Sequence, residues 1–274
     1  MNLYKYRELD SFTIEGLIEG YFWASSREAL NDPCECYYST NSYDKFIDLA
    51  SPLTDEINIR NFRKQFALLQ EGTKELGIFS LSKSPYITSL WAHYSGNHKG
   101  ICIEYDLNKL IAKDEHICEY FDIDYSDIPP DLDIEDIFNK NLLQKIIGTK
   151  SLHWRQEEEF RLITNKQGRN YYSLNSIKSI IFGLFTSAEE KNHLMKLLRD
   201  RNIQFKQLMK NDKSYNLYTE NIDNPFEEKY SPMNIELDSI FLSNESTLDN
   251  YVPYINYKDS QSSYSKKYFQ ISEL

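Results

Sequence analysis

The sequence predicts an α+β domain built on a central, largely antiparallel β-sheet flanked by helices. The first observation is the mixed order of strand-like and helix-like segments, which follow neither a strict βα alternation nor a series of hairpins. The second is that the longest apolar runs, such as residues 177–185, have the length of a strand and fall well short of a membrane span. The third is that no internal repeat is visible, which argues against a solenoid.

The N-terminal part contains two short strands and three helical segments. Aromatic residues bounded by polar ones predict strands at residues 4–6 and 21–24. An Asp-Ser pair before residues 12–18 and a glycine after them predict a short helix. The capping-box spacing at residues 25–28 predicts a brief helix. Apolar spacing predicts further helix over residues 43–72.

The middle of the chain alternates strands with a short helix. Residues 77–82 and 101–105 are compact apolar runs that predict two strands, and residues 119–125 predict a third. Residues 88–95 have the spacing of a helical turn and are followed by a glycine-bounded loop.

The C-terminal part of the domain begins with a long amphipathic helix, predicted over residues 133–150. Strands are predicted at residues 158–164 and 177–182. A second capping-box spacing, at residues 187–190, opens the next helix. Residues 203–208 close the regular pattern.

Two regions follow from these elements. Residues 1–210 are predicted to form the single α+β domain. From residue 211 to residue 274, Asn, Asp, Ser, Glu and Tyr dominate, which predicts a polar C-terminal extension. Composition leaves open whether this extension wraps the domain with short strands or is partly disordered.

Composition argues against several classes of protein. The chain has 274 residues and a formal net charge of -11, which repels phosphate backbones and argues against nucleic acid as a partner. Its four cysteines do not have the density of a secreted disulfide framework. The N-terminus lacks the apolar core of a signal peptide, so we expect a cytoplasmic protein without a membrane partner.

The most informative cluster is acidic. In a strand, alternate side chains share a face, so Glu157, Glu159 and Arg161 would point one way while Phe160 and Leu162 enter the core. Charged groups on a half-buried strand are costly unless they bind a ligand or one another. The sequence therefore predicts a site here. The alternative is a helix in which Glu157 and Arg161 form an ordinary i, i+4 ion pair.

Four further clusters contain polar or aromatic side chains that could contribute to a site: Lys5 with Arg7, Asn31 with Glu35, Ser80 with Ser82, and Trp91 with His93 and Tyr94. Near the acids, the two basic residues would form an anion clamp, and the aromatic residues would form a wall for a flat ring. Each cluster also has a purely structural interpretation, such as an edge strand, a helix stop or a core histidine.

Taken in order, these clusters resemble the bacterial and phage family called domain of unknown function 2971, over roughly residues 3–208. The resemblance brings no established activity. It rests on Lys5–Arg7, Trp23–Ser26, Asn31-Asp32-Pro33-x-Glu35, Phe79–Ser82, Trp91–Tyr94 with His98–Tyr105, Lys150 with Trp154-x-x-Glu157-x-Glu159-Phe160-Arg161, and Ile180–Gly183.

A looser resemblance is to the ADP-ribosyltransferases, which suggests an ADP-ribosyltransferase-like fold and NAD as substrate. A basic residue on an early strand, serines on a middle strand and a late Glu-x-Glu occur here in the same order. By this resemblance Arg7 would bind the pyrophosphate, and Glu159 would bind the nicotinamide ribose and stabilise its oxocarbenium ion. Glu157 would orient the acceptor, while Trp91 or Tyr94 would stack on the nicotinamide. Ser80-Leu81-Ser82 departs from that superfamily's Ser-Thr-Ser.

Three functions remain open. The first is an NAD-dependent ADP-ribosyltransferase-like enzyme acting as a toxin or phage-defence effector. The second is a module in which Arg7, Glu35, His93 and Glu159 hold a nucleotide, another small molecule or a protein target without turnover. The third is a metal-dependent hydrolase or nuclease that uses the glutamates with His93, although no nuclease or paired-histidine motif supports it.

Overall fold

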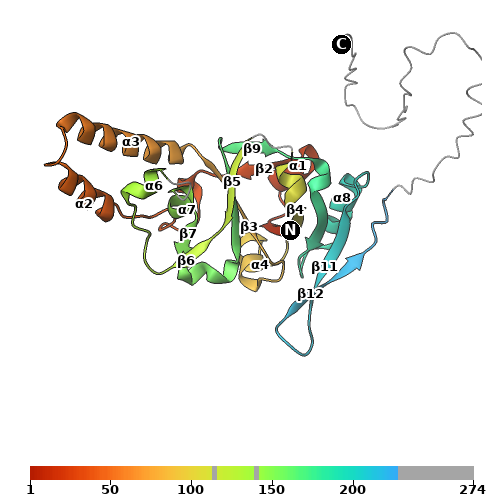
Figure 1. Ribbon diagram of the computed structural model, residues 1–274. Helices are drawn as coiled ribbons and strands as arrows, with labels where there is room; N and C mark the ends of the chain where they lie inside the picture. The colour runs from red at the N-terminus through yellow and green to blue at the C-terminus, as the bar shows by residue number, and fades with distance from the viewer. Residues whose placement is uncertain (113–115, 139–141, 228–274) are drawn as a thin grey trace, which may run out of the picture. The chain divides into compact units, whose positions relative to one another are not determined.

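The computed structural model describes residues 1–112, 116–138 and 142–227 (Figure 1). An eight-stranded sheet has the order β12-β11-β10-β4-β1-β3-β8-β5. Among its neighbours, β10 and β11 pair in parallel and the other pairs are antiparallel. The predicted α+β class with a largely antiparallel sheet is therefore confirmed. The strands are β1 (Asn2–Arg7), β3 (Gly77–Ser82), β4 (Ile101–Asp106), β5 (Ile117–Asp122), β8 (Glu159–Thr164), β10 (Ile177–Phe182), β11 (Gln204–Lys210) and β12 (Leu217–Ile222).

Two small two-stranded sheets and a set of helices complete the described fold. The small sheets pair β2 (Tyr21–Ala24) with β9 (Gly168–Tyr171), and β6 (Asp124–Ser126) with β7 (Thr149–Ser151). The α-helices are α1 (Ser11–Glu19), α2 (Asn41–Ala50), α3 (Glu56–Lys74), α4 (Thr88–Tyr94), α5 (Leu107–Ile111), α6 (Ile134–Phe138), α7 (Leu142–Ile147) and α8 (Ala188–Leu197). Three 3₁₀ helices are η1 (Arg27–Ala29), η2 (Leu152–Glu157) and η3 (Leu174–Ser176).

Alternation along the strands gives the sheet two apolar faces. On one face, residues such as Leu3, Phe79 and Leu162 form a core with Leu17 of α1 and Leu194 of α8. Two separate apolar clusters cover the other face of the sheet. One cluster joins Tyr6 and Cys102 to Trp91 of α4, and the second joins Ile78 and Ile163 to side chains of α2, α3 and α7. Helices α2 and α3 lie side by side in Figure 1. Within the second cluster they contact each other through the stacked rings of Tyr43 and Phe66, whose centroids are 4.1 Å apart.

The pairing of β1 determines where the site forms. Strand β1 pairs with β4 along its whole length, from Asn2↔Asp106 to Arg7↔Ile101. On its other side it pairs with β3 at Tyr4↔Ser82 alone among the described residues. Strands β1 and β3 therefore diverge beyond that pair, and backbone groups at the gap are left for side chains or a ligand to satisfy.

The ends of α1 and α8 follow from their local sequences. Asp10 caps α1 by accepting a hydrogen bond of 2.7 Å from the Thr13 N–H, and Gly20 ends it with a φ of 77°, which favours glycine. Ser187 and Glu190 form the predicted capping box at the start of α8.

The capping box gives a stability prediction. We expect Ser187→Ala to lower the free energy of unfolding by about 1 kcal/mol, because the Glu190 N–H loses its side-chain acceptor. Urea denaturation measures the change. Ser26→Ala is the control, because Ser26 stands at the N-cap of η1 without a side-chain capping bond. Equal losses in the two variants would contradict the role given to the box.

Two predicted helices differ from the observed structure. The brief helix predicted from the capping-box spacing at residues 25–28 is present as the 3₁₀ helix η1, but no capping box forms. Its N-cap is Ser26, because Ser25 exchanges two backbone hydrogen bonds with Ile78 and so continues a β conformation. The long helix predicted over residues 133–150 is interrupted: α6 and α7 are separate, and residues 149–151 form β7 in parallel with β6. Helical periodicity alone does not reveal that long-range pairing. Residues 139–141 of this prediction lie outside the described residues.

The sheet also continues past residue 210. Strand β12 pairs with β11 from Phe205↔Ile222 to Lys210↔Leu217, as Figure 1 shows. The first residues of the predicted polar extension thus add an antiparallel edge strand, while residues 228–274 lie outside the described part of the chain. Within the described residues, no helix combines the length and apolarity needed to cross a membrane.

Candidate functional site

A cavity of about 300 Å³ opens where β1 and β3 diverge. Ligand pockets in proteins begin at about this volume. Its walls come from segments far apart in the sequence: the basic side chains of β1, the serines of β3, the acids at the start of β8, and the loop that follows η1. This cavity is the candidate functional site.

The register of β3 against β8 explains why the acids face the cavity. Ser82 lies opposite Glu159, and Ser80 lies opposite Arg161. Residues directly opposite each other in an antiparallel pair share a face. One face of this strand pair therefore changes from apolar, at Ile78 and Ile163, to polar at its other end.

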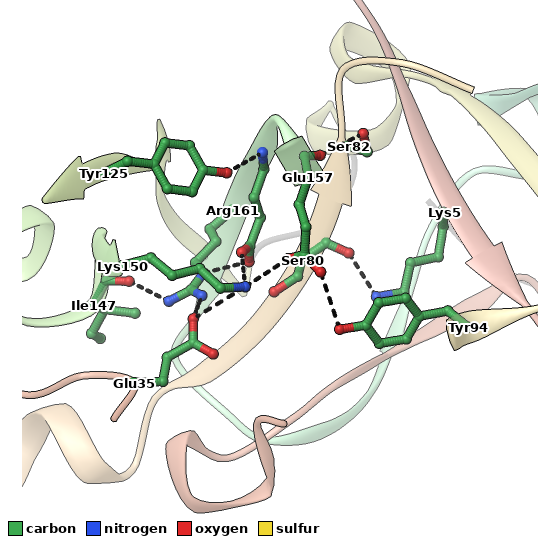
Figure 2. Close-up of polar contacts among 11 residues, drawn as sticks. Lys5, Glu35, Ser80, Ser82, Tyr94, Tyr125, Ile147, Lys150, Glu157 and Arg161 are labelled. Atoms are coloured by element: carbon green, nitrogen blue, oxygen red, sulfur yellow. Dashed lines mark hydrogen bonds and ion pairs between the residues drawn. The ribbon is translucent and has the colours of Figure 1, made fainter. Parts of the chain in front are cut away.

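Lys150 lies at the centre of the acids. Its ammonium nitrogen is 2.7 Å from a Glu157 carboxylate oxygen, 2.8 Å from one of Glu159 and 3.8 Å from one of Glu35. Figure 2 shows Lys150 between Glu35 and Glu157. These four side chains are buried, with 3–8% of each exposed. The neighbouring carboxylates raise the pKa of Lys150 against the opposing effect of its burial, so it stays protonated.

Arg161 lies behind the acids and is fully buried. Its Nε donates to Glu159 at 2.7 Å, and its two terminal nitrogens donate to Glu35 and to the Ile147 carbonyl (Figure 2). Arg161 does not line the cavity. Because buried charges are tolerated when they are paired and hydrogen-bonded, this guanidinium anchors the acids.

Glu157 reaches the cavity by a turn, so the prediction that it belongs to the strand is wrong. The 3₁₀ helix η2 ends at Glu157, Glu158 takes a left-handed conformation with φ of 46°, and β8 begins at Glu159. The Ser82 hydroxyl donates to the Glu157 carbonyl at 2.8 Å, and the Tyr125 hydroxyl accepts from the Glu159 N–H at 2.8 Å. These bonds hold both acids toward Lys150 despite the change of backbone conformation.

The opposite wall of the cavity is basic. The Lys5 ammonium donates to the Ser80 carbonyl at 2.6 Å, where β3 lacks a β1 partner. Burial, followed by the charge of Arg7, lowers the pKa of Lys5 to about 7. Burial also lowers the pKa of Arg7. Within the part of the chain that the structure describes, the Arg7 side chain forms neither an ion pair nor a hydrogen bond, so its guanidinium is available to an anion.

Aromatic side chains border the acids. The Tyr94 hydroxyl is 3.4 Å from the Oε1 of Glu157, and burial raises the pKa of Tyr94. The Trp154 ring centroid is 5.1 Å from the Lys150 nitrogen, a cation–π distance. Trp23 lies at the rim, where 42% of its surface is exposed.

The structure brings most of the predicted site residues to this one cavity. They are Lys5, Arg7, Asn31, Glu35, Ser80, Ser82, Tyr94, Glu157 and Glu159. Arg161 contacts two of them from behind.

Trp91 and His93 do not line the cavity. Trp91 is buried against Tyr6, with its indole N–H donating to the Pro85 carbonyl at 2.8 Å, and His93 is exposed. Successive residues of a helix point about 100° apart, so α4 presents Tyr94 alone of the three.

Sequence reasoning left Lys150, Trp23, Trp154 and Tyr125 without a role in the site. Lys150 and Trp154 belong to one of the motifs that carry the family resemblance, so their spacing from Glu157 was a usable signal. Nothing local marks Tyr125, which reaches the acids from β6. In residues 1–112, 116–138 and 142–227, no three His, Cys, Asp or Glu side chains are grouped so as to hold a metal ion.

Comparison with known families matches residues 90–162 to the family described as Protein of unknown function (DUF2971). Over this segment the chain is similar to the DUF2971 family. The matched segment runs from α4 into β8 and contains Tyr94, Lys150, Glu157, Glu159 and Arg161. Lys150, Glu157 and Glu159 therefore lie within the DUF2971 match, whereas Glu35 lies outside it. Comparisons with curated proteins and with solved structures gave no significant match.

Proposed function

We propose that the cavity binds a nucleotide, with NAD as the first candidate, and that the protein is an ADP-ribosyltransferase-like enzyme. One observation carries the proposal: an unpaired guanidinium, Arg7, lines the same cavity as two buried carboxylates, Glu157 and Glu159. A nucleotide has the matching chemistry, since its phosphates are anionic and its ribose hydroxyls donate hydrogen bonds to carboxylates.

The basic wall is suited to the phosphates. Arg7 presents several N–H donors in a fixed planar geometry that matches phosphate oxygens. Lys5 lies beside it, with its pKa lowered to about 7, and would gain a proton when an anion approaches. Both side chains line the cavity opposite the acids, so a bound phosphate would leave the sugar directed toward β8.

Among the acids, Glu157 has the better position to act on the sugar. Both carboxylate oxygens of Glu159 already accept a charged donor, one from Arg161 and one from Lys150. Glu157 accepts from Lys150 through Oε2, while its Oε1 has the longer Tyr94 contact of 3.4 Å. We therefore give the catalytic role to Glu157 in place of Glu159, and give Glu159 the role of positioning Lys150.

The reaction balances with these groups. The bond between ribose C1′ and the nicotinamide nitrogen breaks, and its electron pair leaves on the nicotinamide, which becomes neutral. The carboxylate of Glu157 stabilises the positive charge that develops on the sugar. A lone pair of the acceptor forms the new bond to C1′, and the acceptor's proton passes to Glu157 or to water.

The experiment is to incubate the full chain with NAD and to measure released nicotinamide by chromatography. Release above that of NAD alone supports the proposal, and Arg7→Gln should reduce it. Intact NAD after prolonged incubation with folded protein, with and without an added protein extract as acceptor, would overturn the enzymatic role. A toxin or phage-defence effector would also lower the NAD content of cells that express it.

A second candidate is a nucleotide-binding module without turnover. It is favoured by the ion pairs around Lys150, which already satisfy Glu159 on both oxygens in the absence of ligand. Binding without turnover predicts that NAD raises the melting temperature by mass action and is recovered unchanged. Melting curves recorded beside the nicotinamide assay separate the two candidates.

Lys5 gives a pH-dependent prediction for either candidate. Because its pKa in the free protein is about 7, Lys5 is mainly neutral at pH 8.5, while a bound anion raises that pKa. We expect pyrophosphate binding near that pH to take up close to one proton, as measured by calorimetry in buffers of different ionisation enthalpy. Lys5→Met should remove most of this uptake. Uptake that persists in Lys5→Met would show that another group titrates.

A further inference from the structure

Two aromatic side chains outside the acidic centre are exposed beside the cavity. Trp23 is 42% exposed and Phe12 is 36% exposed. Their ring centroids are 5.6 Å apart and their planes meet at 69°, so the edge of one ring supports the face of the other. We call this pair the Trp23–Phe12 platform. Tryptophan is highly buried on average, so the Trp23 indole offers more accessible aromatic surface than is usual for this residue.

The platform adjoins the unpaired guanidinium. A second, smaller cavity is lined by Phe12 and Trp23, and it shares Lys5, Arg7 and Trp23 with the main cavity. A ligand that reaches from one cavity to the other therefore passes Arg7. This arrangement places an apolar, π-rich surface on one side of the anion-binding group and the carboxylates on the other.

The backbone holds Trp23 in place without a ligand. Strand β2 alternates, so Phe22 enters the core and Trp23 points outward. Trp23 lies opposite Arg169 in β9. In the next residue pair Ala24 lies opposite Gly168, which has no Cβ that could cover the edge of the indole. A Cβ at Gly168 would lie 3.9 Å from that edge. A ring held by a strand on one side and by Phe12 on the other is preorganised for stacking.

We propose that the Trp23–Phe12 platform stacks a nucleobase whose phosphate lies on Arg7. The inference rests on the proposed function. It adds where the second half of the substrate binds: a base–sugar–phosphate unit lies on the side of Arg7 away from Glu157. A purely apolar ligand would not use the guanidinium, and a simple anion would not use the rings. A nucleotide uses both.

The test compares ligands with and without a base. Adenosine diphosphate and inorganic pyrophosphate are titrated into the full chain by calorimetry. For the unaltered protein, adenosine diphosphate should bind at least about tenfold more tightly, because stacking on an aromatic side chain is worth about 1–3 kcal/mol per base. Trp23→Ala should weaken adenosine diphosphate about tenfold and leave pyrophosphate unchanged, while Trp23→Phe should retain most of the affinity.

Tyr215→Ala is the matched control, since Tyr215 is a fully exposed aromatic residue in the turn between β11 and β12. It should change neither affinity. Equal weakening of both ligands by Trp23→Ala would overturn the platform, because it would indicate a structural role. Tight binding of both ligands with no effect of Trp23→Ala would overturn the platform and leave the proposed function standing. Failure of the unaltered protein to bind either ligand would overturn both.

Discussion

Glu157→Gln is expected to reduce nicotinamide release by about 10²–10³-fold, the loss typical of removing one group that stabilises developing charge. The substitution keeps the shape of the side chain and removes the negative charge that faces the sugar. Because Lys150 keeps its 2.8 Å contact with Glu159, the buried ammonium retains a carboxylate partner. The measurement is the initial rate of nicotinamide release at saturating NAD, with circular dichroism to check the fold.

The control is the neighbouring glutamate. Glu158 is exposed and does not line the cavity, so Glu158→Gln makes the same chemical change outside it. It should leave the rate within about twofold, because an exposed charge contributes little at a distance in water. If Glu157→Gln and Glu158→Gln release nicotinamide at the same rate, the catalytic role of Glu157 is lost.

The second large effect concerns stability. Lys150→Met should lower the free energy of unfolding by about 3–5 kcal/mol, because it leaves two buried carboxylates without their shared cation. Glu157 and Glu159 each lie within 2.8 Å of the Lys150 nitrogen. Denaturation in urea at pH 7.5 measures the loss. The loss should shrink as the pH is lowered, since protonation neutralises a buried carboxylate that has lost its cation.

A half-exposed ion pair provides the comparison. Lys83 contacts Asp122 at 2.9 Å, but 42% and 61% of these side chains are exposed. Lys83→Met should therefore cost about 0–1 kcal/mol, as expected for a pair that water already screens. A loss of similar size in Lys83→Met and Lys150→Met would mean that burial does not determine how much the ion pairs of Lys150 contribute to the free energy of unfolding.

Local sequence predicted the elements whose signals are local. Short apolar runs identified β3, β4, β8 and β10, and the Ser187-x-x-Glu190 spacing identified the start of α8. The strand β9 was missed, because it is polar and is held by β2, a partner distant in the sequence. The interruption of residues 133–150 was missed for the same reason, since β7 exists only through its pairing with β6. Composition left open whether the polar extension forms short strands, and the pairing with β11 decides this for β12.

The sequence by itself determined which side chains were candidates and which of them could share a face, because the direction of a side chain depends on the backbone conformation of its immediate neighbours. Only the tertiary structure decided that Arg7, Ser82 and Glu159 line one cavity, since strands β1, β3 and β8 become neighbours through hydrogen bonds between segments far apart in the chain. It also decided that Lys150 lies between the acids and that Trp91 is buried away from them. The spacing of residues along the chain limits the direction in which each side chain points. A binding site also depends on the distances between side chains from different segments, and these distances are established by tertiary packing.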